Sequence, residues 1–154
     1  WVIVQDLDEL LDINEWQLME EDAKGVTKIK SECWHMINME DNLDVKTIKY
    51  GYRNLNDTVY DKDLLFNKKY VDINYRVDAH FTDSKGKVID SIKRYRIYHY
   101  MFISSDFYVA KNKRNAEQLS EINKKNNWGI GCLRTEEELR KNYQQKKEQA
   151  VKIL

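Results

Sequence analysis

The stretch at residues 70–82, YVDINYRVDAHFT, decides the fold that the sequence predicts. Its apolar side chains fall at every second position, and polar side chains fill the positions between them. A period of two over this length predicts a strand with one buried and one solvated face. Residues 83–87, DSKGK, supply a turn in which Gly86 can take a positive φ. A second strand is predicted from residue 88 to residue 103.

Further elements are predicted on both sides of this hairpin. Helices are predicted at 5–24 and at 26–39, where apolar residues recur three and four apart, and Gly25 separates them. The loop at 54–69 is polar except for Leu64, Leu65 and Phe66, which could hold it down. The remaining predictions are strands at 43–53, 106–110 and 128–133, a surface helix at 111–127, and a final helix that Thr135 opens with Glu138 in a capping box.

This order of elements predicts an α+β fold, because helices, strands and a last helix follow one another without alternating βαβ units. Strands of about a dozen residues exceed the usual length of about 5–6, so the sheet is expected to bend. The fold class is N-terminal helices packed on a strongly curved, mostly antiparallel sheet, plus a C-terminal helix. We expect one domain at 1–134 and an appended helix at 135–154.

Composition and charge exclude some classes of protein. The net charge is zero, which argues against a protein that wraps nucleic acid, although residues 1–24 hold eight acidic residues against Lys24 alone. The sequence has no apolar run long enough to span a membrane. Two cysteines make no disulfide framework, so a reducing compartment is expected. The chain begins at Trp1 and not at Met, so we expect a processed form that has lost any targeting segment.

A metal site is not expected from the sequence. Cys33 and His35 lie two apart on a predicted helix, which places them on different faces. His80 and His99 lie on paired strands, and two histidines without a third ligand fall short of a zinc site. Cys33 belongs to an apolar stripe, where an inert buried thiol is usual. We therefore expect no cofactor and no catalytic residue.

A nuclease is one alternative. The chain is somewhat similar to the PD-(D/E)xK nucleases in its order of elements, and those enzymes need two acids and a lysine on adjacent strands to hold a divalent ion. Asp72 and Asp78 are candidate acids, but residues 90–93, DSIK, have the wrong spacing. Residues 44–46, DVK, have the right spacing but precede the acids that they should follow. A degenerate nuclease remains an alternative.

Two groups of residues are candidates for a binding surface. Residues 97–103, IYHYMFI, are apolar on both sides, so this strand is either central and covered on both faces, or one face lines a pocket or an interface. The basic residues near one end of the hairpin form either a solvated face or a docking site for RNA backbone or anionic lipid. The candidate interface residues are Tyr98, Tyr100, Phe102, Lys85, Lys87, Lys93, Arg94, Arg96, Lys111, Lys113 and Arg114.

Residues 43–103 resemble the nuclear transport factor 2-like superfamily. A strand like LDVKTIKYGY is followed by a variable loop, and then by YVDINYRVDAHFTDSKGK and an aromatic-rich strand. The pattern is most similar to the C-terminal domain of the import-motor anchor of the mitochondrial inner-membrane translocase, which a mitochondrial large-ribosomal-subunit protein shares. Residues 106–127 are longer than this family usually has, and the C-terminal helix is additional.

The resemblance implies a cone-like sheet and a non-catalytic docking module. It also implies the mitochondrial matrix or the matrix face of the inner membrane, with other subunits of a membrane-associated or ribosomal assembly as partners. Enzymes of the superfamily place an acid and a histidine in the cone mouth, whereas His80 and Asp78 fall on the opposite face of the predicted strand. A small-molecule enzyme or carrier with a pocket in the cone remains another alternative.

Overall fold

The computed structural model describes residues 1–40, 43–55, 58–76 and 82–154, and it shows a mixed α+β protein, as predicted. The described residues group into two compact units. Unit 1 comprises Trp1–Trp34 and Arg53–His99, and unit 2 comprises His35–Tyr52 and Tyr100–Leu154. This division differs from the predicted one at residue 134, because the C-terminal helix groups with two earlier segments of the chain.

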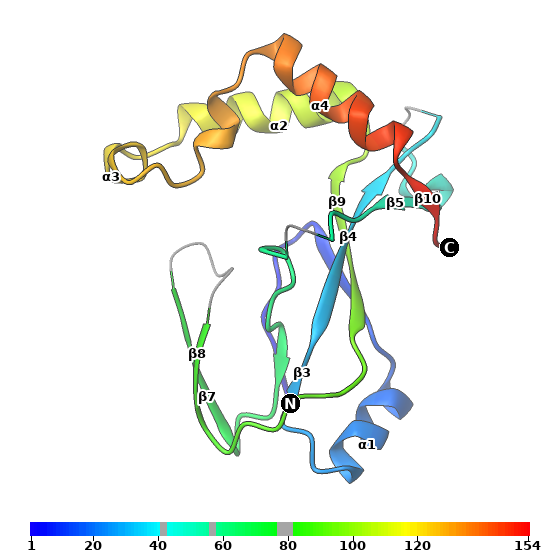
Figure 1. Ribbon diagram of the computed structural model, residues 1–154, viewed down its shortest axis with the longest axis vertical. Coiled ribbons are helices and arrows are strands. Elements are labelled where there is room, and N and C mark those ends of the chain that lie inside the picture. Colours follow the sequence, from blue (N-terminus) through cyan, green and yellow to red (C-terminus); the bar gives the residue numbers. More distant parts are fainter. Residues whose placement is uncertain (41–42, 56–57, 77–81) are drawn as a thin grey trace. The chain divides into compact units, whose positions relative to one another are not determined.

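Unit 1 consists of short antiparallel strands and one helix (Figure 1). It holds a three-stranded sheet in the order β1-β6-β3, a two-stranded sheet of β7 and β8, and the pairing of β2 with β9. The strands are β1 (Val2–Ile3), β2 (Glu9–Asp12), β3 (Lys28–Ile29), β6 (Leu65–Phe66), β7 (Val71–Tyr75), β8 (Thr82–Gly86) and β9 (Tyr95–Phe102), the last of which ends in unit 2.

Helix α1 (Glu15–Ala23) has clear signals at both ends. Asn14 accepts a hydrogen bond from the Gln17 backbone N–H, and the Gln17 side chain accepts one from the Asn14 N–H, which completes a capping box. Gly25 follows the last turn with a φ of 79°, so it ends the helix as predicted. The predicted helix at 5–24 is right for this half, but residues 9–12 form β2 instead.

The predicted helix at 26–39 is wrong, because these residues form β3 and β4 (Ser31–Ile37). Ser31, Cys33, His35 and Ile37 are all buried, which is the period of two that a strand requires. Short apolar runs fit either period, so the spacing that suggested a helix was ambiguous. The consequence for the site is that Cys33 and His35 share one face.

The long hairpin at 70–103 is also corrected. β7 pairs with β8 in the register Val71↔Gly86 to Tyr75↔Thr82, so residues 83–86 of the predicted turn belong to a strand. Gly86 does have the predicted positive φ, of 94°. The second long strand is limited to β9, and residues 77–81, with Asp78 and His80, lie outside the described residues.

The predicted cone is not found in the described part of the chain. The hydrogen-bonded order of the largest sheet is β10-β5-β4-β9-β2, and neither it nor the two smaller sheets closes. β9 has β4 on one side and β2 on the other, and Ile97, Tyr98 and His99 are buried on its two faces. The interpretation of residues 97–103 as a central strand is therefore confirmed.

Unit 2 combines helices with the ends of β4 and β9 (Figure 1). α2 packs against α4 and against η3, and β5 pairs with β4 and with β10. The predicted strands at 106–110 and 128–133 are wrong, since they are helical. The elements are η1 (Val45–Thr47), β5 (Tyr50–Tyr52), α2 (Ser105–Glu117), α3 (Glu121–Lys125), η3 (Ile130–Leu133), α4 (Glu136–Glu148) and β10 (Val151–Lys152).

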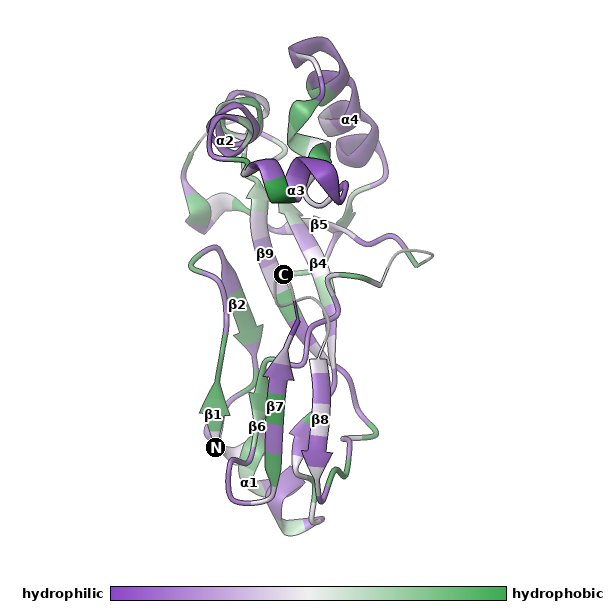
Figure 2. Ribbon diagram, turned by 90° about the vertical axis from the view of Figure 1, so that its left-hand side faces the viewer, coloured by the Kyte–Doolittle hydropathy of each residue, from purple (hydrophilic) through white to green (hydrophobic). Residues whose placement is uncertain are grey.

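Each unit has its own apolar core. In unit 1, Leu64 and Leu65 are buried in the core and Phe66 is buried beside them in sequence, so this segment does hold the loop down. In unit 2, Leu139 and Tyr143 of α4 pack with residues of α2 and β9. Figure 2 shows that most of α4 is otherwise hydrophilic. The predicted capping box of Thr135 and Glu138 is confirmed.

Candidate functional site

The aromatic part of the predicted binding surface lies largely in the protein interior. Tyr98 and Phe102 are 5% and 3% exposed, and Tyr100 is half-buried. The Tyr98 hydroxyl donates to Asp12 Oδ2 at 2.9 Å. The Phe102 ring lies 4.5 Å from that of Tyr108 in the core of unit 2. These side chains stabilise the fold, so they do not form a free surface here.

The predicted basic residues do not form one patch within a unit. Lys85, Lys87, Lys93, Arg94 and Arg96 belong to unit 1, whereas Lys111, Lys113 and Arg114 belong to unit 2.

Several of these cations are also engaged by neighbouring groups. Lys113 Nζ lies 2.6 Å from Glu136 Oε2, and Arg94 Nη1 donates to the Ser31 carbonyl at 3.0 Å. Lys93 Nζ lies 4.6 Å from the centre of the Tyr95 ring. Their charge is therefore partly compensated within the protein.

A different surface stands out on α1. Trp16, Met19, Glu20 and Ala23 recur at intervals of three and four residues, so they share one face of the helix, and all four are exposed. Trp16 is 77% exposed and Met19 is 56% exposed. We call these four residues the α1 outward face. Acidic side chains border it, because Glu15 and Asp22 are also exposed.

The opposite face of α1 fixes the helix to unit 1. Leu18 packs against the apolar core, and Glu21 is buried. The Tyr95 hydroxyl donates to Glu21 Oε1 at 3.0 Å, and Lys24 Nζ lies 3.1 Å from the same atom. The helix is therefore held in a defined orientation while Trp16 faces solvent. The sequence showed the acidic character of this segment, but its outward apolar pair could be recognised only once the correct helix bounds were known.

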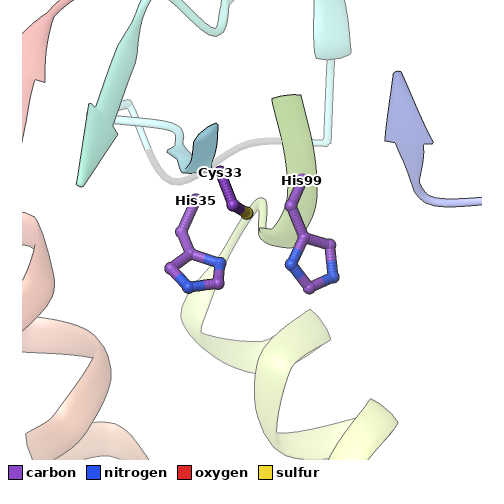
Figure 3. A group of neighbouring side chains, drawn as sticks. All are labelled: Cys33, His35 and His99. Atoms are coloured by element: carbon purple, nitrogen blue, oxygen red, sulfur yellow. The ribbon is translucent and has the colours of Figure 1, made fainter. Parts of the chain in front are cut away.

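Two metal-ligand side chains of unit 1 lie close together on the strands β4 and β9. One ligand atom each of Cys33 and His99 lies within 4.8 Å of the other, and Figure 3 shows both side chains. Both residues are buried. His35 follows two positions after Cys33 on the same strand, so these two share a face, which the sequence missed because it placed both on a helix.

The environment of Cys33 does not activate it as a nucleophile. Burial, followed by the negative charges of Glu9 and Asp61, raises the pKa of the thiol to about 12. A reactive cysteine needs a lowered pKa and some exposure. Free Cys33 in this environment is a stable thiol, as the sequence predicted for a buried cysteine.

Buried charges elsewhere in unit 1 pair with one another. Lys62 Nζ lies 2.7 Å from Glu9 Oε1 and 2.6 Å from Asp6 Oδ2, although Lys62 and Glu9 are both buried. Arg53 donates to both carboxylate oxygens of Asp61, at 2.7 and 2.8 Å. Such mutual pairing is typical of structural ion pairs. No pattern in the sequence predicted these pairs, because the partners in each are brought together by tertiary structure.

The enzymatic alternatives gain little from the described residues. Two cavities in unit 1 measure about 220 and 270 Å³, below the range of about 300–1,000 Å³ for ligand pockets. Among the nuclease candidates, Asp90 lies within 3.5 Å of Lys28 and 3.3 Å of Lys30, and Asp72 pairs with Lys68 at 2.8 Å. No helix in the described ranges combines the length and the apolar composition of a membrane span. No protein-family model, curated protein or solved structure matches this chain.

Proposed function

We propose that this protein is a non-catalytic docking module that inserts the α1 outward face into an apolar groove of a partner protein. The observation that carries this proposal is the exposure of Trp16 and Met19 on one face of a helix whose other face is fixed to the core. Amphipathic helices commonly bind partners by laying such a face in a groove. Trp and Met are enriched in interfaces, and Trp is frequent among the residues that dominate binding energy.

The charge around this face defines the partner. Glu15, Glu20 and Asp22 are exposed on α1, and Lys24 follows the helix as its nearest cation in the sequence. A complementary groove would therefore carry Lys or Arg at its rim and apolar side chains at its centre. Complementary rim charges accelerate association and are screened by salt. The occupant of the α1 outward face is thus a protein with a basic-rimmed apolar groove.

The chemistry of the described residues supports a non-catalytic role. The buried carboxylates of Glu9 and Asp61 are paired with Lys62 and Arg53, and the pKa of the Cys33 thiol is raised. These groups are arranged for stability, whereas an active site commonly holds groups whose pKa values are tuned toward the working pH. A role as a subunit of a mitochondrial assembly remains a prediction that depends on the sequence resemblance.

Site-specific photo-crosslinking tests the proposal. A photoreactive amino acid replaces Trp16 or Met19 in the full chain, and replaces Ile92, which is 101% exposed, as the control position. We expect positions 16 and 19 to crosslink one and the same protein in source cells, while position 92 does not. Crosslinks that are equally abundant from all three positions, or absent from 16 and 19, would contradict the proposal. The captured protein is then purified, and its affinity for the wild-type chain and for Trp16→Ala is measured.

A further inference from the structure

We propose that the segment at residues 120–134 of unit 2, which holds α3 and η3, docks on the surface of an anionic lipid bilayer. Four large apolar side chains of this segment are exposed: Ile122 by 67%, Trp128 by 40%, Ile130 by 42% and Leu133 by 52%. We call these four residues the α3–η3 apolar surface. The inference does not depend on the docking role of α1, because that helix belongs to the other unit.

The backbone of this segment sets where the four side chains lie. The Trp128 N–H donates to the Asn123 carbonyl at 2.9 Å, so the chain turns back onto α3 and keeps Trp128 beside it. Gly129 has a left-handed φ of 67° and begins η3. A 3₁₀ helix has about three residues per turn, so Ile130 and Leu133 lie on one face of η3. These two side chains therefore form one exposed apolar ridge.

The inner side of the segment is fixed to α2. η3 packs against α2, and Cys132 is buried although Ile130 and Leu133 are exposed. A Cβ at Gly129 would lie 3.5 Å from the Leu119 side chain, so the chain here approaches the end of α2 closely. Figure 1 shows α3 at one end of the helical part of unit 2. The apolar side chains are therefore presented to solvent from a fixed backbone.

The charge of the surrounding chain indicates an anionic ligand. Arg114 and Lys125 are exposed, and neither forms an ion pair with a described residue. Lys124 is exposed too, although it pairs with Glu121 at 2.7 Å. Residues 111–134 hold six cations against two acids, a net charge of +4, the cations being Lys111, Lys113, Arg114, Lys124, Lys125 and Arg134 and the acids Glu117 and Glu121.

The acids that follow this segment are engaged in the first turn of α4. Glu136 Oε2 lies 2.6 Å from Lys113 Nζ, and Glu138 accepts a hydrogen bond from the Thr135 N–H at 2.8 Å. Acidic side chains at this position stabilise the N-terminus of a helix. Their charge is therefore partly compensated within unit 2, whereas Arg114 and Lys125 keep theirs.

An anionic bilayer fits both the apolar side chains and the cations. Surfaces that bind membranes combine Trp and aliphatic side chains, which enter the boundary between headgroups and acyl chains, with Lys or Arg, which anionic lipids attract. Trp favours this boundary because its ring is amphipathic. RNA backbone would use the cations but not the aliphatic side chains. A groove suits one continuous helix face, whereas these side chains come from two short helices and the turn between them.

Co-sedimentation of the full chain with vesicles tests this docking site. One vesicle type is phosphatidylcholine alone, and the other is phosphatidylcholine with phosphatidylserine. We expect binding to the second type, little binding to the first, and weaker binding as salt is added. Ile122→Ser should lower the partition coefficient about fivefold or more, and Lys125→Glu about tenfold. Leu43→Ser is the matched control, because Leu43 is 66% exposed in the same unit, and it should bind like wild type.

Quenching of Trp fluorescence by brominated phosphatidylcholine in the anionic vesicles shows whether Trp128 enters the bilayer. The chain has four tryptophans, so the quenched signal is compared with that of Trp128→Phe, in which it should largely disappear. If Ile122→Ser fails to fold by circular dichroism, this comparison decides alone.

Three results would overturn the proposal. These are equal binding to the two vesicle types, equal partition coefficients for Ile122→Ser and Leu43→Ser, and quenching that is unchanged in Trp128→Phe. Binding to single-stranded RNA without binding to vesicles would also overturn it, and would assign the cations to RNA. Because these measurements need no partner protein, their result is separate from that of the crosslinking experiment.

Discussion

Lys62 is a buried side chain whose charged form is stabilised by two acidic residues, Asp6 and Glu9. Burial by itself would lower the pKa of Lys62, but hydrogen bonds and charge from Asp6 and Glu9 raise it overall. The ammonium therefore remains charged in the interior. Glu9 in turn relies on Lys62, because its side chain is completely buried. Each charge makes the burial of the other tolerable.

We predict that Lys62→Met destabilises the protein by about 3–5 kcal/mol, because it leaves the buried Glu9 carboxylate without its cation. Urea unfolding followed by circular dichroism measures the free energy of unfolding. The double variant Lys62→Met with Glu9→Gln should recover part of the loss, since it removes the unpaired charge. A single variant within about 0.5 kcal/mol of wild type, the range of ordinary surface substitutions, would contradict this account.

Tyr95 should make stability depend on alkaline pH. Burial, together with its hydrogen bond to Glu21, raises the pKa of Tyr95 from 10.0 to about 12. Since the folded state holds this proton more tightly, the contribution of Tyr95 is complete below pH 10 and is lost as pH rises toward 12. Burial also raises the pKa of Tyr75, Tyr98, Tyr100 and Tyr108, so the comparison must be made with a variant that lacks only the Tyr95 hydroxyl.

We predict that Tyr95→Phe lowers the free energy of unfolding at pH 8 by about 1–3 kcal/mol, because buried Glu21 loses a donor. The difference between wild type and variant should shrink above pH 10. Urea unfolding at several pH values measures it. A difference that stays constant up to pH 12 would show that the hydroxyl does not titrate as described.

At the residue scale, sequence spacing located candidate ligands but could not decide whether they meet. Cys33, His35 and His99 were all recognised as metal-ligand types. The grouping failed because a side chain two positions away points to another face in a helix and to the same face in a strand. His80, which could face His99 on the paired strands, lies outside the described residues. The structure places Cys33 within 4.8 Å of His99.

At the element scale, local signals were the most dependable. Gly25 and the capping box of Thr135 with Glu138 act through neighbours in sequence, and both predictions are confirmed. The predictions for residues 26–39 and 106–110 were wrong because their apolar spacing fits both the helix period and the strand period. Packing partners across the sheet or the helices decide between the two. The outward face of α1 was also missed, because the residues that share it could be identified only once the bounds of the helix, Glu15–Ala23, were known.

The β7–β8 hairpin provides an element-scale prediction. Gly86 has a φ of 94°, and a Cβ at this position would overlap the Tyr70 carbonyl oxygen. We predict that Gly86→Ala destabilises the protein by about 2 kcal/mol or more, from the left-handed φ and the clash. Gly131→Ala is the matched control, because a Cβ there meets no atom within 4 Å. Equal melting temperatures for the two variants would contradict this reading of the hairpin.

At the scale of the whole molecule, the sequence predicted the α+β class but not the division of the chain. Each unit is assembled from two separated segments, and strands β4 and β9 contribute to both. Pairing between distant segments has no signature in local periodicity, so a long continuous hairpin was the simplest prediction. The cone followed from that hairpin, and it is replaced by three open sheets in the described residues.

The proposed function gives different faces of unit 1 different roles, one in stability and one in binding. The core and the ion pairs of unit 1 hold α1 in place, and its outward face remains available to a partner. Trp16→Ala should therefore leave the free energy of unfolding within about 0.5 kcal/mol of wild type, as expected for an exposed side chain. The substitution should instead weaken the affinity for the partner protein.

The most direct test is the dissociation constant for the protein captured by crosslinking, measured by titration calorimetry with purified components. We predict that Trp16→Ala weakens binding by about thirty-fold or more, equivalent to about 2 kcal/mol, and that added salt weakens the wild-type complex. Ile92→Ala, at a side chain that is even more exposed than Trp16 but lies away from α1 in sequence, should bind like wild type. Equal dissociation constants for Trp16→Ala and wild type would contradict docking through α1.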